Sequence, residues 1–136
     1  MNHPSIWQKL QSCERIIVES CSGRQAVLDI QGSLSKALDC HHGICIGINI
    51  IWSKQANMDV NRTNLLLTSS DETLDFALLP HADNWFLWQR YSKEPTSSEF
   101  NRKLTLHCAL VKYVSSGFNN KSLENNDNLL EVMSFA

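Results

Sequence analysis

The sequence predicts an α+β domain in which an antiparallel sheet is flanked by N-terminal and C-terminal helices. Three observations carry this prediction. Apolar and small residues alternate strictly over residues 44–52, which is typical of a strand. Two more alternating segments, 74–79 and 85–91, are separated by a polar turn and predict an antiparallel hairpin. Residues 97–116 carry apolar side chains at helical spacing and predict a long final helix.

The N-terminal part is expected to begin with a helix over residues 5–20. Ser5 is a suitable N-cap, and four apolar residues behind it share one helical face: Ile6, Leu10, Cys13 and Ile17. Gly23 is expected to end this helix. Residues 25–32 predict a short strand, whereas residues 33–43 fit a loop, a helical turn or another strand.

The clearest strand signal lies in residues 44–52. The large side chains Ile44, Ile46, Ile48, Ile50 and Trp52 fall on one face, which is expected to meet the core. The residues between them include Cys45, Gly47 and Asn49, so we expect another group to lie close to that second face. A short second helix is expected after this strand, with Met58, Leu65 and Leu66 at helical spacing.

The hairpin and the last helix follow. Leu74, Phe76 and Leu78 should share one face of the first hairpin strand, and Pro80 should close that strand. A turn at residues 81–84 leads into the aromatic strand. The final helix is expected to start with a capping box formed by Thr96 and Glu99 and to stop at Gly117.

Composition narrows the possible functions. The chain has 136 residues, 43% of them hydrophobic, with a formal net charge of −2, which disfavours binding to nucleic acid or to an anionic membrane. The N-terminus does not resemble a secretory signal, and the longest apolar run is too short to span a bilayer. Five scattered cysteines, an odd number, favour reduced thiols. We therefore expect a soluble cytoplasmic protein.

The segment CHHGIC raises the possibility of chemistry. Cys40, His41, His42 and Cys45 are all residue types that bind zinc, but their spacing is unusual and no second ligand pair follows. A nucleophile built from Cys40 or Cys108 with a histidine is a further alternative, although Cys108 lies on the apolar stripe of the last helix. The simpler interpretation is a polar loop with no metal, no cofactor and no catalytic residue.

The segment DNWFLWQRY places large apolar groups on both faces of one strand. A small domain with a single sheet covers one face with its own helices, so the second face needs a partner unless helices pack on both sides. We expect protein contacts through this strand and the final helix, because tryptophan and tyrosine dominate interface hot spots. The predicted contact residues are Trp85, Phe86, Trp88, Tyr91, Phe100, Leu104 and Val111.

The predicted order of elements resembles the small class I chaperones of bacterial type III secretion. A closer resemblance, to the later half of the SpiC/SepD-type type III secretion proteins, covers residues 65–114. The residues that carry it are Leu65 to Leu67, Asp75-Phe76-Ala77-Leu78, Ala82-Asp83, Trp85, Tyr91, Ser97-Ser98-Glu99, Leu104 to Leu106 and Cys108 to Leu110. The first half of the chain shows only a general similarity to these proteins, in the segments VLDIQG and ICIGINII.

This resemblance implies a cytoplasmic protein that acts at the secretion apparatus by binding and release. Such proteins bind the gatekeeper subunit together with a second small chaperone-like protein, and they favour translocator export while effectors are held back. Three alternatives stay open, namely a homodimeric chaperone of one secreted effector, a small metal protein or enzyme using the CHHGIC segment, and an unrelated ligand-binding α+β domain. The expected organisation is a single domain over residues 1–118, followed by a mobile Asn-rich tail over 119–136 with a short apolar end.

Overall fold

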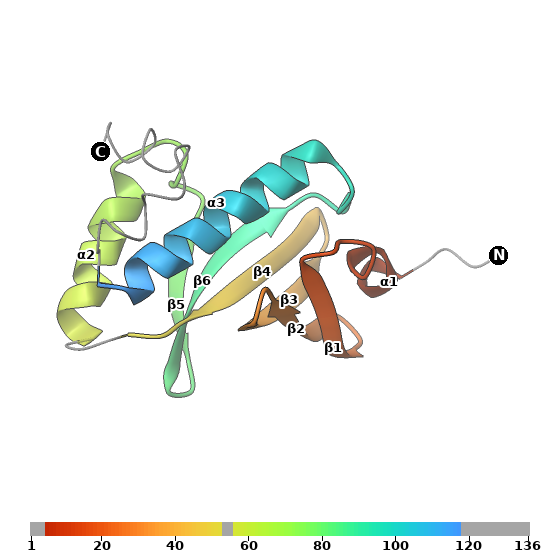
Figure 1. Ribbon diagram of the computed structural model, residues 1–136, viewed down its shortest axis with the longest axis horizontal. Coiled ribbons are helices and arrows are strands. Elements are labelled where there is room, and N and C mark those ends of the chain that lie inside the picture. Colours follow the sequence, from red (N-terminus) through yellow and green to blue (C-terminus); the bar gives the residue numbers. More distant parts are fainter. Residues whose placement is uncertain (1–4, 53–55, 118–136) are drawn as a thin grey trace.

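The computed structural model describes residues 5–52 and 56–117, which form a six-stranded antiparallel sheet with three helices (Figure 1). The predicted α+β class is therefore confirmed. The strand order in the sheet is β1-β2-β3-β4-β6-β5. In chain order the elements are α1 (Ile6–Leu10), β1 (Ile16–Ser22), β2 (Gln25–Ile30), β3 (Ser33–Cys40), β4 (Gly43–Ile50), α2 (Ala56–Thr68), β5 (Ala77–His81), β6 (Asn84–Tyr91) and α3 (Ser98–Ser115).

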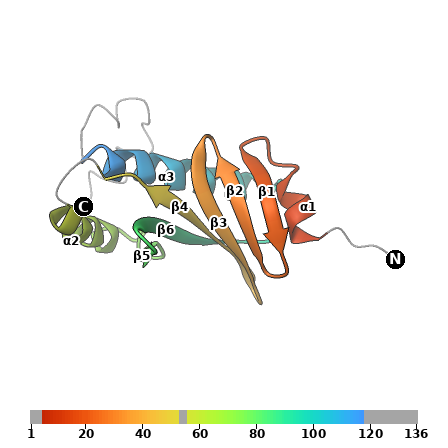
Figure 2. The same cartoon turned by 90° about the horizontal axis from the view of Figure 1, so that it is seen from below.

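The core lies between α3 and one face of the central strands. Figure 1 shows α3 running along β6 and β4, and in Figure 2 the strands β1 to β4 lie in front of it. As predicted, the isoleucines of β4 point to this helix side, and Ile44, Ile46, Ile48 and Ile50 are all buried. The register of β4 on β6 places Tyr91, Gln89, Leu87 and Trp85 on the same side.

The prediction of one helix over residues 5–20 is wrong. Ser5 does cap a helix, with a complete capping box to Gln8, but α1 ends at Leu10. Residues 16–18 are Ile-Ile-Val, whose branched side chains favour extended backbone, and they pair with β2 as strand β1. Gly23 accordingly lies in the β1–β2 turn, where its φ of 61° is easily adopted.

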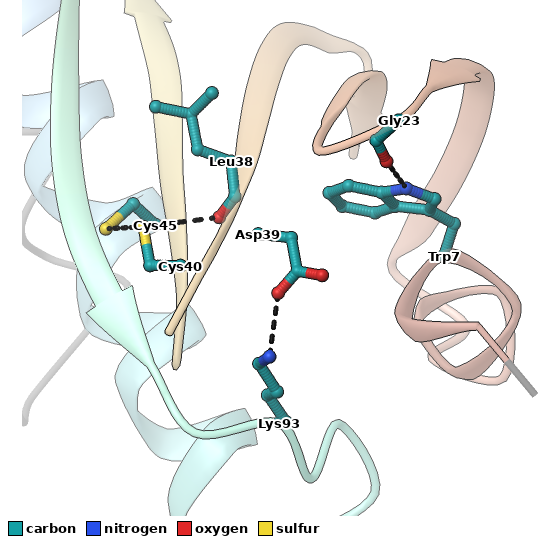
Figure 3. A network of polar contacts seen from close by, with 7 residues as sticks. All are labelled: Trp7, Gly23, Leu38, Asp39, Cys40, Cys45 and Lys93. Carbon is teal, nitrogen blue, oxygen red and sulfur yellow. Dashed lines mark hydrogen bonds and ion pairs between the residues drawn. The ribbon is translucent and has the colours of Figure 1, made fainter. Parts of the chain in front are cut away.

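Two side-chain contacts join segments that are distant in the sequence (Figure 3). The indole nitrogen of Trp7 donates to the carbonyl of Gly23 at 3.1 Å, which ties α1 to the β1–β2 turn. Lys93, just after β6, pairs with Asp39 of β3 at 2.8 Å. The segment 33–43, which was ambiguous in sequence, contains strand β3 and its turn into β4.

The first hairpin strand starts later than predicted. Residues 71–75 form a turn, and the hydroxyl of Thr73 donates to the carbonyl of Leu67 at 2.8 Å. Leu74 is therefore exposed, whereas Phe76 and Leu78 are buried as expected. Pro80 does not close the strand but lies within β5, opposite Trp85, which is possible because β5 is an edge strand.

The second and third helices match their predictions with two changes. In α2 the buried side is formed by Thr63 and Leu67, whereas Leu65 is exposed. The N-cap of α3 is Ser97 rather than Thr96, and its side chain accepts a hydrogen bond from the backbone of Phe100. Gly117 follows α3 with a φ of 73°, as predicted for the stop. The predicted tail over 119–136 lies outside the described residues.

A buried histidine joins α3 to β6. The Nδ1 and Nε2 atoms of His107 lie 2.7 Å from the Tyr91 hydroxyl and 2.7 Å from the Leu87 carbonyl. The carbonyl can only accept, so Nε2 carries the proton and Nδ1 accepts from the tyrosine. Burial lowers the pKa of His107 from 6.5 to about 4, so the ring is neutral in the folded protein.

We expect the stability of the protein to fall as the pH falls from 6.5 towards 4. The unfolded chain takes up a proton on His107 below pH 6.5, whereas the folded chain does so only near pH 4. The neutral, buried histidine therefore contributes its full stability above pH 6.5, and this stability is lost as the pH falls from 6.5 towards 4. Between pH 7 and pH 5 this group alone should remove about 2 kcal/mol from the free energy of unfolding. Urea unfolding at both pH values measures the loss.

The matched control for this prediction is His107→Gln, which removes the titrating group and leaves every exposed histidine in place. The loss between pH 7 and pH 5 should be about 2 kcal/mol smaller in this variant. If the free energy of unfolding falls equally in both proteins, His107 is not the group that causes the loss.

A second prediction concerns the β5–β6 turn, where Ala82 has a φ of 54°. Ala82 is the first of the two loop residues, a position at which glycine is preferred because a Cβ is disfavoured at positive φ. Ala82→Gly should raise the free energy of unfolding by about 0.5 kcal/mol. Ala77→Gly, at an exposed alanine of β5, is the control and should lower it by about 0.5–1 kcal/mol. If the free energy of unfolding falls in both variants, the backbone at Ala82 is not strained.

Candidate functional site

The face of the sheet opposite α3, here called the open face, carries several exposed apolar side chains. The alternation along each strand places on it Ile17, Leu34, Leu38 and Leu79, which are exposed by 55%, 48%, 38% and 51%. Lys36, His81, Phe86, Trp88 and Arg90 lie on the same face. Isolated exposed leucines are common, but several on one sheet face form a surface suited to a partner.

The open face contains a groove. It has a volume of about 450 Å³ and is lined by side chains of β1, β2 and β3 together with His81 and Trp88 of the β5–β6 hairpin. Strands β1 and β6 are not neighbours in the sheet, so the twist of the sheet must bring the hairpin towards β1–β3. The principal lining side chains are Ser20, Ser22, Val27, Lys36, Leu38, His81 and Trp88.

Trp88 forms one wall of the groove, and Gly47 determines where its indole lies. These residues are paired across β4 and β6. A Cβ on Gly47 would lie 2.5 Å from Cε2 of Trp88, which no real contact allows, so the indole rests directly on the glycine backbone. The expectation that another group lies close to the small residues of β4 is confirmed, and that group is the protein's own tryptophan.

Phe86 also lies on the open face but is only 1% exposed. Trp88, His81 and Lys36 surround it. The ring centroids of Phe86 and Trp88 are 6.4 Å apart, His81 approaches edge-on at 6.3 Å, and the Lys36 ammonium lies 5.5 Å from the Phe86 centroid. The cation over the ring is weakly stabilising and holds the lysine on the groove wall. Lys36 therefore places a positive charge beside an aromatic floor.

The structure separates the predicted contact residues into two groups. Only Phe86 and Trp88 lie on the open face, and Trp88 is the more exposed of the two. Trp85 is partly buried on the helix side. The remaining four, Tyr91, Phe100, Leu104 and Val111, are buried between α3 and the sheet. As placed here, those four side chains stabilise the core and do not reach the surface.

Sequence reasoning missed the aliphatic part of the open face. Leu34, Lys36 and Leu38 alternate along β3, and Leu79 extends the same face on β5. The alternation in SLSKALDC was visible, but it pointed to this surface only once the segment was known to be a strand next to β4. The sequence places His81 in the turn, whereas it is the last residue of β5.

The CHHGIC segment forms the end of β3, a turn and the start of β4. The sulfurs of Cys40 and Cys45 are 3.4 Å apart, and the rings of His41 and His42 contact each other at 4.4 Å. Among the described residues, no three His, Cys, Asp or Glu side chains are grouped as metal ligands. Burial raises the pKa of the Cys108 thiol, which keeps it protonated and unreactive.

Comparison of the chain with models of known protein families, with characterised proteins and with solved structures found no match. Among the helices that the structure describes, none has the length and apolar character needed to cross a lipid bilayer.

The packing of Trp88 on Gly47 gives a direct test of the groove wall. Gly47→Ala should lower the free energy of unfolding by about 1–3 kcal/mol, because the new methyl group displaces the indole. In a Trp88→Ala background the same substitution should be neutral or stabilising, because alanine is favoured over glycine within a strand. Urea unfolding of the four proteins gives the coupling energy. Additive effects of the two substitutions would show that the indole does not rest on Gly47.

Proposed function

We propose that the protein is a non-enzymatic cytoplasmic regulator of bacterial type III secretion. In this proposal it binds the gatekeeper subunit and controls the order in which translocators and effectors are exported. The resemblance of residues 65–114 to SpiC/SepD-type proteins supports the pathway. The element order supports it as well, because a helix, an antiparallel sheet interrupted by a second helix, and a long final helix follow one another.

The observation that carries the proposal is the open face. Its exposed leucines, the partly exposed Trp88 and the groove beside it form an apolar surface with few charges. Tryptophan next to aliphatic residues is typical of the centre of a protein interface. Within the described part of the chain, Lys36 pairs with no carboxylate. A partner segment that combines apolar side chains with one carboxylate fits this chemistry.

The edges of the sheet are less suited to a partner than the face. At the β1 edge, the Gln11 side chain makes long hydrogen bonds of 3.5 Å to both the N–H and the carbonyl of Val18. At the other edge, β5 is five residues long and contains Pro80, which has no N–H to offer. Addition of a partner strand is therefore disfavoured, and contact through side chains of the open face is favoured.

The test is binding to the gatekeeper subunit encoded with the same secretion system. Trp88→Ala should weaken this binding about 30-fold, equivalent to about 2 kcal/mol, because the indole is the largest exposed apolar group of the groove. Leu65→Ala is the matched control. It removes an exposed apolar side chain from α2, away from the open face, and binding should not change. Calorimetric titration with purified proteins measures both affinities.

Thermal unfolding of each variant accompanies the titration, since Trp88 also packs on Gly47 and its removal lowers stability. If the affinity for the gatekeeper is unchanged while the melting temperature falls, Trp88 belongs to the core. If the chain forms a homodimer that binds an effector segment and does not bind the gatekeeper, the protein is a dedicated effector chaperone instead.

A further inference from the structure

Cys40 and Cys45 are placed together by the register of the β3–β4 hairpin. Cys40 pairs with Gly43 and Cys45 pairs with Leu38, so the two cysteines are diagonal neighbours on the open face. Their sulfurs are 3.4 Å apart, and Figure 3 shows the two side chains converging between the strands. Both are free thiols with partial exposure. Solvent-borne reagents therefore reach this pair.

We propose that Cys40 and Cys45 are a redox site at which a peroxide converts the dithiol into a reversible intramolecular disulfide. This inference goes beyond the proposed function and does not depend on it. A disulfide bond is about 2.05 Å long, so the sulfurs need to approach by only about 1.4 Å. Small rotations of the two side chains supply this movement while the backbone pairing of β3 with β4 is kept.

The reaction balances with one hydrogen peroxide per pair. The thiolate of Cys40 attacks one peroxide oxygen, the O–O bond breaks, and the departing hydroxide takes up a proton to give water and a sulfenic acid on Cys40. The sulfur of Cys45 then attacks the sulfur of Cys40, the S–O bond breaks, and a second water leaves with the proton of the Cys45 thiol. The two thiols lose two electrons in total, and the peroxide gains them.

The surroundings assign the order of the two cysteines. Burial, together with hydrogen bonding and charge repulsion from Cys40, raises the pKa of Cys45 to about 11, so Cys45 is a poor first nucleophile near neutral pH. Oxidation of Cys40 removes both of these contributions from Cys40. Arg90, which pairs with Cys45 across β4 and β6, favours the Cys45 thiolate. Cys45 thus becomes more reactive once Cys40 has been oxidised.

Of the other three cysteines, Cys13 lies near enough to Cys108 to raise its pKa, but no hydrogen bond joins their sulfurs in the described residues. Cys13 is buried, Cys21 is exposed on β1, and Cys108 lies on α3. In the described part of the chain, Cys40 with Cys45 is the one sulfur–sulfur hydrogen bond. A mild oxidant should therefore act selectively on this pair.

The test is treatment of the fully reduced, full-length protein with equimolar hydrogen peroxide, followed by peptide mapping without reduction. The expected product is a Cys40–Cys45 disulfide within one chain, with a mass loss of about 2 Da, and dithiothreitol should reverse it. Free thiols should fall from the five in the sequence to three. The proposal is overturned if both cysteines stay reduced, if they are oxidised to separate sulfinic acids, or if they link different chains.

Single variants test the order of attack. In Cys45→Ser, Cys40 should accumulate sulfenic acid that dimedone traps, whereas Cys40→Ser should leave Cys45 unlabelled at the same peroxide concentration. Cys21→Ser is the matched control and should still form the disulfide. Equal labelling of Cys40 and Cys45 in the two single variants would contradict the assigned order. Loss of the disulfide in Cys21→Ser would contradict the assigned pair.

Discussion

The hydrogen-bonded bridge from Tyr91 through His107 to the carbonyl of Leu87 fixes α3 on the sheet. The helix is apolar over most of its circumference, so apolar packing alone would allow several rotations and registers. A buried imidazole with two specific partners removes that freedom, because any slip would leave buried polar atoms without partners. Fixing Tyr91 on the helix side also fixes its neighbours, since a strand alternates between faces and Trp88 must then point to the opposite side.

This constraint divides the sheet into a face covered by α3 and the open face. The described helices cover the isoleucines of β4, and the opposite face keeps Leu34, Leu38 and Leu79 exposed. The protein lowers the cost of that exposure locally, since Trp88 lies on Gly47 and covers Phe86 together with Lys36 and His81. What stays exposed is an aliphatic surface with a tryptophan at its centre, next to a groove. This arrangement is the basis of the proposed protein contact.

Local patterns predicted most of the fold, and the errors arose where tertiary contacts decide. The isoleucine alternation of β4 and the helical stripe of α3 were sufficient because each pattern is long and regular. The stripe through Cys13 and Ile17 was misleading because a branched run can continue a helix or start a strand, and pairing with β2 selects the strand. The site was predicted only in part. Aromatic residues on both faces of β6 indicated a partner surface, but composition alone does not say which face the helices cover.

The small residues of β4 serve the open face in two ways at once. The indole of Trp88 packs on Gly47, and Cys45, two residues earlier on the same face, contacts Cys40. Arg90 and Trp88 lie opposite these two residues on β6, so the thiol pair and the tryptophan share one strip of surface. A covalent bond between β3 and β4 would leave the backbone ladder intact and would rearrange only side chains beside this strip. In the proposed redox reaction, a change at the thiols alters this strip without unfolding the domain, because most of the buried core lies on the helix side of the sheet.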